Sequence, residues 1–189
     1  MTRISKKIML FNKPMLSVFL FTILTFTALE CAQAQAQAPQ PAPETKNLSY
    51  FVGSWTVNGD LKPGPMGPGG KITGTETWEW MDGHFFIVSH STMSGAMGNG
   101  SGLSVMGYNS DDKKYTYHEF DSMGQVENAT GTYENGTWSW TSDEHMGGQT
   151  MKGRYTAKEV SPTSYSFKFE LSQDGTNWTT VMDGTATKK

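Results

Sequence analysis

Residues 125–142 read QVENATGTYENGTWSWTS, and this stretch decides the fold class. Two segments rich in Thr, Tyr and Trp flank the dipeptide Asn135-Gly136. Asn-Gly supplies the positive φ angles that a tight hairpin turn requires, whereas Thr and aromatic residues favour strands. The stretch therefore predicts an antiparallel β-hairpin, with Trp138 and Trp140 on one face of its second strand.

The same pattern of strand segments and turn residues repeats from about residue 48 to the C-terminus, with no convincing helical periodicity. It predicts ten strands, at residues 54–61, 72–80, 84–93, 102–109, 114–121, 125–134, 137–142, 150–158, 164–172 and 176–185. Asp82-Gly83 and Asp174-Gly175 supply further tight turns. Almost every gap is shorter than the roughly twelve residues of a parallel crossover, so consecutive strands are expected to pair antiparallel.

Ten strands in series leave two free edges, and pairing the first strand with the last removes them. We therefore predict an all-β fold, an antiparallel up-and-down barrel of about ten strands. Residues 164–172 indicate a distinct inner face, because Tyr165, Phe167, Phe169 and Leu171 share one face of their strand.

Residues 84–93 depart from this alternation, because residues 85–88 put apolar side chains on both faces of the strand. Something is expected to cover the outer face. One explanation is a helical turn at the start of the domain, through Leu48 and Phe51. The other is a homodimer contact through the outer face of residues 84–93.

The first 34 residues have the features of a secretory signal peptide. A basic start is followed by an uncharged, largely apolar stretch at 16–29, which is shorter than the ~20 residues of a membrane span. Ala32-Gln33-Ala34 is a small-x-small cleavage site. We expect cleavage near Ala34, with sites at Ala36 and Ala38 as alternatives, and a periplasmic or secreted protein without a stable membrane span.

Three segments follow from this: a signal peptide at 1–34, a disordered spacer at 35–47 rich in Ala, Gln and Pro, and a single barrel domain at 48–189. Cys31, the one cysteine, is lost with the signal peptide unless it carries a lipid. Of 15 basic and 18 acidic residues, four basic and one acidic precede residue 35, which leaves a net charge of −6. That charge, without a Lys/Arg cluster, argues against a nucleic-acid partner.

Several short motifs of the chain resemble one known family. They are Leu48, Val52-Gly53-Ser54-Trp55, Pro63-Gly64, Gly74, Glu76, the run from Trp80 to Phe85, Gly107-Tyr108 and Asp121-Ser122. With these motifs the chain resembles the lipocalin-like family catalogued as domain of unknown function 1579. The resemblance implies a calycin-type barrel, like those of lipocalins and fatty-acid-binding proteins, and supplies no catalytic residues. It implies a structural role for Gly53 and Trp55, with the Trp closing one end of the barrel.

The glycine-rich segment 64–71 is not a phosphate-binding loop, because Ile72 stands where Ser or Thr is required and a strand follows. Together with segment 94–102 it is expected at the rim of the barrel. No Gly-x-Ser-x-Gly nucleophile motif is present, and no catalytic residues are predicted.

Histidine spacing argues against a metal site. His84 and His90 share one face of a strand but lie about 20 Å apart at ~3.3 Å per residue, too far to bind one ion. No metal or cofactor is predicted. A haem, which needs only one axial ligand, remains a minor alternative, and His118 could face a cavity from the middle of its strand.

The residues expected to line a ligand site are Glu76, Trp78, Trp80, Phe86, His118, Trp138, Trp140 and Phe167. Glu76 shares a face with two tryptophans, where loss of solvation would raise its pKa, unless that face points outward at its level. The leading hypothesis is an exported barrel that binds a small apolar or amphipathic molecule. The alternative is a scaffold with a solid core and an outer apolar patch for a partner. A haem-binding or enzymatic barrel is the third.

Overall fold

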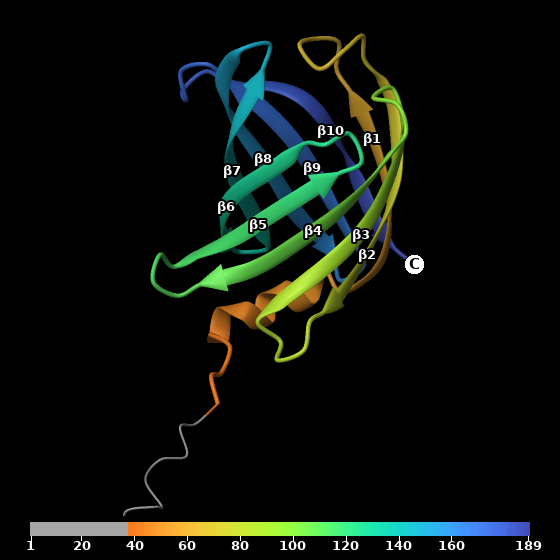
Figure 1. Cartoon of the computed structure of the whole chain (residues 1–189). Helices are drawn as coiled ribbons and strands as arrows, with labels where there is room; N and C mark the ends of the chain where they lie inside the picture. The colour runs from red at the N-terminus through yellow and green to blue at the C-terminus, as the bar shows by residue number, and fades with distance from the viewer. Residues whose placement is uncertain (1–37) are drawn as a thin grey trace, which may run out of the picture. The chain divides into compact units, whose positions relative to one another are not determined.

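The structure, a computed structural model, describes residues 38–189, which contain one 3₁₀ helix and ten β-strands. The helix η1 spans Pro43–Tyr50. The strands are β1 (Gly53–Leu61), β2 (Gly70–Trp80), β3 (Phe86–Gly95), β4 (Gly100–Asn109), β5 (Lys114–Asp121), β6 (Val126–Glu134), β7 (Thr137–Met146), β8 (Gln149–Ser161), β9 (Ser164–Ser172) and β10 (Thr179–Lys188). They form a closed antiparallel barrel in which β1 pairs with β10 (Figure 1). The predicted fold class is confirmed.

The turn residues form most of the hairpins as the sequence predicts. Asn135 and Gly136 have φ angles of 49° and 74° between β6 and β7. Gly147 and Gly148, with φ angles of 57° and 79°, form an equally short turn after β7. That turn lets β7 extend to residue 146, four residues beyond the predicted end.

The last strand begins later than predicted, at residue 179 rather than 176. The carboxylate of Asp174 accepts backbone N–H bonds from Thr176 and Asn177, each at 2.8 Å. These bonds hold the segment 173–178 as a loop, in the way that Asp side chains stabilise turns. The strand therefore shifts toward the C-terminus and ends at Lys188.

The two ends of the barrel differ. The helix η1 lies across the end at which β1 begins, which we call the closed end (Figure 1). The opposite end, which we call the open end, carries the five connections at 62–69, 96–99, 122–125, 147–148 and 173–178. The two glycine-rich segments predicted at the rim both lie there.

Trp55 fixes the closed end. Its side chain is fully buried, its indole N–H donates to the carbonyl of Phe51 at 2.6 Å, and the Lys188 ammonium lies 5.0 Å from its ring centroid. The Phe51 ring packs against Trp138 with centroids 5.0 Å apart. Burying a Trp removes about 150–250 Å² from water, worth about 4–6 kcal/mol as an upper bound.

Two sequence predictions about the segment before β1 were wrong. Residues 43–47, assigned to a disordered spacer, belong to η1, because Thr45 is buried and Asn47 donates to the Tyr115 hydroxyl at 2.9 Å. Leu48 and Phe51 do not cover the outer face of β3, because both are buried in the core at the closed end. The predicted signal peptide at 1–34 lies outside the described residues. Within the part of the chain that is described, no helix is long and apolar enough to cross a membrane.

Candidate functional site

The closed half of the interior is an aromatic core. Trp78, Trp138, Trp140 and Phe167, all predicted to line the site, face inward and are at most 6% exposed. The rings of Trp138 and Trp140 are nearly parallel, with centroids 6.2 Å apart. Trp80 also packs against this cluster but stays partly exposed. Because these rings pack on one another, they fill the interior at the closed end of the barrel.

Phe86 and His118 lie on the outer surface, so the prediction that they line the interior was wrong. Phe86 is 44% exposed and pairs with Gly107 on the outer face. The His118 ring is hydrogen-bonded to the side chain of Asn128 at 2.7 Å, also outside. β5 has aromatic residues on both faces. Tyr115 rather than His118 faces inward, where its ring packs against Trp138 and its hydroxyl donates to the Glu44 carbonyl of η1.

The histidines do not fit a histidine-ligated haem inside the barrel. His90 and His118 are exposed on the outer face of their strands, and His145 is exposed near the open end. His84 is exposed in the turn between β2 and β3, beside Trp80. Within residues 38–189 no three His, Cys, Asp or Glu side chains are placed to hold a metal ion.

A row of inward-facing residues crosses five neighbouring strands toward the open end. Strand register places its members side by side: Trp78 (β2), Ser89 (β3), Ser104 (β4), Glu119 (β5) and Glu127 (β6). We call them the inner row. Glu144 of β7 lies beyond Glu127 and two residues from Ser142, whose hydroxyl donates to it at 2.5 Å. Glu76 lies two residues from Trp78 on the same inner face, and the Trp78 indole donates to its carboxylate at 3.0 Å.

Hydrogen bonds join part of the inner row. The Tyr117 hydroxyl, which faces inward from β5, donates to Glu119. The hydroxyls of Ser104 and Tyr117 are hydrogen-bonded at 3.2 Å. Ser89 differs, because it is 1% exposed and its hydroxyl has no hydrogen-bond partner. Buried hydroxyls without a partner are uncommon, since desolvation is then uncompensated.

The surroundings of these carboxyl groups favour their neutral form. Burial raises the pKa of Glu127 to about 7, and the charges of Glu144 and Glu119 add to the effect. Burial also raises the pKa of Glu119, although the hydrogen bond from Tyr117 acts to lower this pKa. For Glu76 burial again raises the pKa, against the hydrogen bond from the Trp78 indole.

These inner acids nevertheless keep some contact with solvent. Glu76, Glu119, Glu127 and Glu144 all face the interior but remain partly exposed, unlike the tryptophans at the closed end. Of these four acids, the sequence predicts only Glu76 to face the interior, because Glu76 lies between two threonines that point to the other face of the strand. The other three lie on strands whose two faces are similar in polarity, so alternation does not reveal which face is inside.

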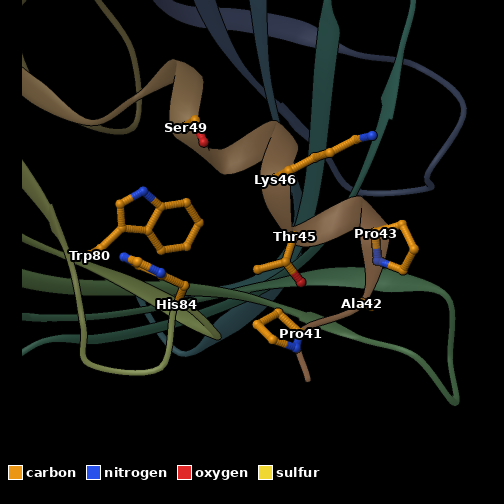
Figure 2. A pocket seen from close by; sticks show the side chains of 8 residues that line it. All are labelled: Pro41, Ala42, Pro43, Thr45, Lys46, Ser49, Trp80 and His84. Atoms are coloured by element: carbon orange, nitrogen blue, oxygen red, sulfur yellow. The ribbon is translucent and has the colours of Figure 1, made fainter. Parts of the chain in front are cut away.

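Two hollows also lie on the outside of the barrel. One, of about 390 Å³, lies between η1 and the turn after β2, where Figure 2 shows Trp80 and His84 across from Thr45, with the Lys46 side chain pointing away from them. The other, of about 520 Å³, runs over the outer face of β8, β9 and β10 and includes Lys158. Both are shallow, whereas small-molecule sites usually enclose most of their ligand.

Comparisons with known proteins agree with this fold. The family model described as protein of unknown function (DUF1579) matches residues 40–188. Rv2717c from M. tuberculosis has a similar crystal structure, with a TM-score of 0.54 at 10% identity over 79% of this chain and 99% of that one. The S-type phycobiliprotein lyase CPES from Guillardia theta gives a TM-score of 0.52 at 13% identity, over 76% and 91%.

A search of curated proteins finds no match to the sequence. At these low identities the two structural neighbours establish the barrel fold alone. The family match, in contrast, covers the whole barrel and its preceding helix, and the sequence-based resemblance is confirmed. The chain therefore belongs to the DUF1579 family.

Proposed function

We propose that this protein is exported and binds a small apolar or amphipathic molecule in the open half of its barrel. The observation that carries the proposal is the contrast between the two halves of the interior. Aromatic rings fill the closed half, whereas the inner row ends in small and acidic residues that solvent reaches. An apolar base with a few polar groups above it is the usual composition of a small-molecule pocket.

The fold and one neighbour support this proposal. A closed barrel of about eight or more strands has an interior that side chains can just fill or that holds one ligand, and its diameter grows with strand number. This barrel has ten strands, with glycine-rich connections at its open end. The structural similarity to the phycobiliprotein lyase CPES is compatible with a small-molecule role for a barrel of this shape.

A neutral fluorescent probe, N-phenyl-1-naphthylamine, tests the proposal. We expect its emission to rise saturably with one site per chain, and tryptophan emission to fall in parallel. Ser91→Phe should abolish this binding, because Ser91 faces inward and is paired with Glu76. His90→Phe is the matched control and should leave binding unchanged, because His90, next to Ser91 in the chain, faces outward and is exposed. Absence of saturable binding to the folded wild-type protein would refute the proposal.

A partner-binding scaffold is the second candidate, because the outer face of β3 to β6 carries exposed apolar residues. Phe86, Leu103, Phe120 and Val126 are 38–58% exposed there. Leu103, Phe120 and Val126 are consecutive neighbours by register. If Ser91→Phe leaves probe binding unchanged while Phe120→Ser weakens it, the probe binds this outer patch and the scaffold function is favoured instead.

A further inference from the structure

The acidic groups of the interior have no basic partner in the described structure. The ion pairs there join Lys62–Asp183, Lys71–Asp60, Lys152–Asp143, Arg154–Glu170 and Lys168–Glu170, all on the outer face or at the rim. None involves Glu76, Glu119, Glu127 or Glu144. Lys188 is the inward-facing basic residue of the described strands, and it lies at the closed end, where its ammonium donates to the Tyr50 carbonyl at 3.1 Å.

This arrangement is electrostatically unfavourable without a positive charge. Glu127 on β6 faces Glu119 and Tyr117 on β5 and Glu144 and Ser142 on β7. The carboxylates among these groups repel one another, and burial weakens their solvation. A cation placed among them would favour their ionised forms and would be attracted by them.

A separate observation also indicates a ligand at this place. The hydroxyl of Ser89 is buried, points inward in the inner row, and has no hydrogen-bond partner. On one side it adjoins Trp78, whose indole binds Glu76, and on the other Ser104, which is linked through Tyr117 to Glu119. A polar group of a ligand entering the row would satisfy this hydroxyl, which can donate or accept a hydrogen bond. A hydrocarbon would leave it unpaired.

The size and shape of the cation follow from the walls around it. The acidic groups are too dispersed to supply three ligands to one metal ion within residues 38–189. The wall opposite Glu119, Glu127 and Glu144 is formed by β1, β2, β9 and β10, and it is apolar between Glu76 and the open end. Its inward residues include Leu61, Ile72, Phe169 and Met182. A charged nitrogen on an apolar body suits this combination better than a compact ion.

We propose that the ligand is an amphipathic organic amine. Its ammonium group lies beside the paired residues Glu119 and Glu127, with the charge of Glu144 beyond them, and its apolar part lies against the wall of β1, β2, β9 and β10. This proposal rests on the proposed function and adds to it the charge and chemical class of the ligand.

Three probes with the same ten-carbon chain separate charge from hydrophobicity: decylammonium, 1-decanol and decanoate. Binding to the full exported chain is measured by calorimetry at pH 8, with each probe below its micelle concentration. We expect decylammonium to bind at one site about tenfold or more tightly than decanol, and decanoate to bind most weakly. Near pH 7, where Glu127 is partly protonated in the free protein, decylammonium binding should also release protons, detected as a heat that depends on the buffer.

Matched variants locate the charge. Glu127→Gln combined with Glu144→Gln should weaken decylammonium binding about tenfold and leave decanol binding unchanged. The double variant should fold, because it removes two neighbouring acidic charges and leaves the size of the side chains nearly unchanged. Glu79→Gln combined with Glu134→Gln is the control, since both residues are exposed, and it should leave decylammonium binding unchanged.

The outcomes distinguish this inference from the proposed function. If decanol or decanoate binds as tightly as decylammonium, the amine proposal is overturned while the binding function stands. If the interior and surface double variants lose affinity equally, the cation binds the acidic surface and the amine proposal is likewise overturned. If none of the three probes binds the folded protein, both proposals fail.

Discussion

The indole N–H of Trp55 on β1 donates to the backbone carbonyl of Phe51, four residues earlier, at 2.6 Å. This bond joins the end of the segment that follows η1 to the first strand of the barrel, inside the core. A single side chain therefore couples the helix to the closed end.

Trp55→Ala should destabilise the fold by about 3–5 kcal/mol, because it leaves a cavity and an unpaired carbonyl. The free energy of unfolding in urea measures this. Phe120→Ala, at a position 52% exposed, should cost less than about 1 kcal/mol. A loss for Trp55→Ala as small as that of Phe120→Ala would contradict a structural role for Trp55.

Ser89→Ala should leave the unliganded protein equally stable or more stable, by up to about 1 kcal/mol, because a buried hydroxyl without a partner is removed. Ser104→Ala should destabilise it by about 1 kcal/mol, because Ser104 loses its bond to Tyr117. Thermal unfolding measures the stability of the two variants, which carry the same substitution at paired positions of adjacent strands. Equal losses would show that Ser89 has a partner after all.

Glu170 faces outward on β9 but its side chain is only 7% exposed, beneath Arg154, which lies 4.1 Å from the Trp178 ring centroid. Burial alone would raise the pKa of Glu170, but hydrogen bonds from Lys168 and Arg154 outweigh it and lower the pKa. Glu170→Gln should therefore cost about 1–3 kcal/mol at pH 7. The loss should shrink as pH falls from the ordinary pKa of Glu through the lower folded value.

The control for Glu170 is Asp143→Asn, which removes an ion pair whose side chains are 57% and 55% exposed. Its cost should stay below about 1 kcal/mol. Urea unfolding at pH 3 and pH 7 provides the comparison. A Glu170→Gln effect that is the same at both pH values would argue against a charge-dependent role.

Stability should fall as pH rises between about 4.5 and 7, because of Glu127. Its folded pKa is about 7, above the ordinary value of 4.5, so the unfolded chain loses this proton first and gains stability relative to the folded state. The loss of folding free energy reaches up to about 3 kcal/mol. It is complete above the pKa of Glu127 in the folded state and absent below its pKa in the unfolded state. Glu127→Gln should flatten this part of the stability profile, whereas Glu134→Gln should not.

The sequence by itself determined the strands, most of the turns and the antiparallel order, because these depend on local propensities and short connections. It also oriented β2 and β9 correctly. In β9, Tyr165 and Phe167 alternate with polar residues, so burial of the apolar set leaves one orientation. Closure followed from the same reasoning, because free strand edges are unfavourable.

Only the tertiary structure decided the orientation of β5 and the composition of the open half. With Tyr117 on one face and Phe120 on the other, the sequence allows burial of either set. In the structure the face with Tyr115 is inside, where Tyr115 packs against Trp138 and its hydroxyl bonds to η1. The gathering of Glu119 and Glu127 depends on register between strands, which no local pattern encodes. Charges that look solvated along the chain become an acidic interior only when the barrel closes around them.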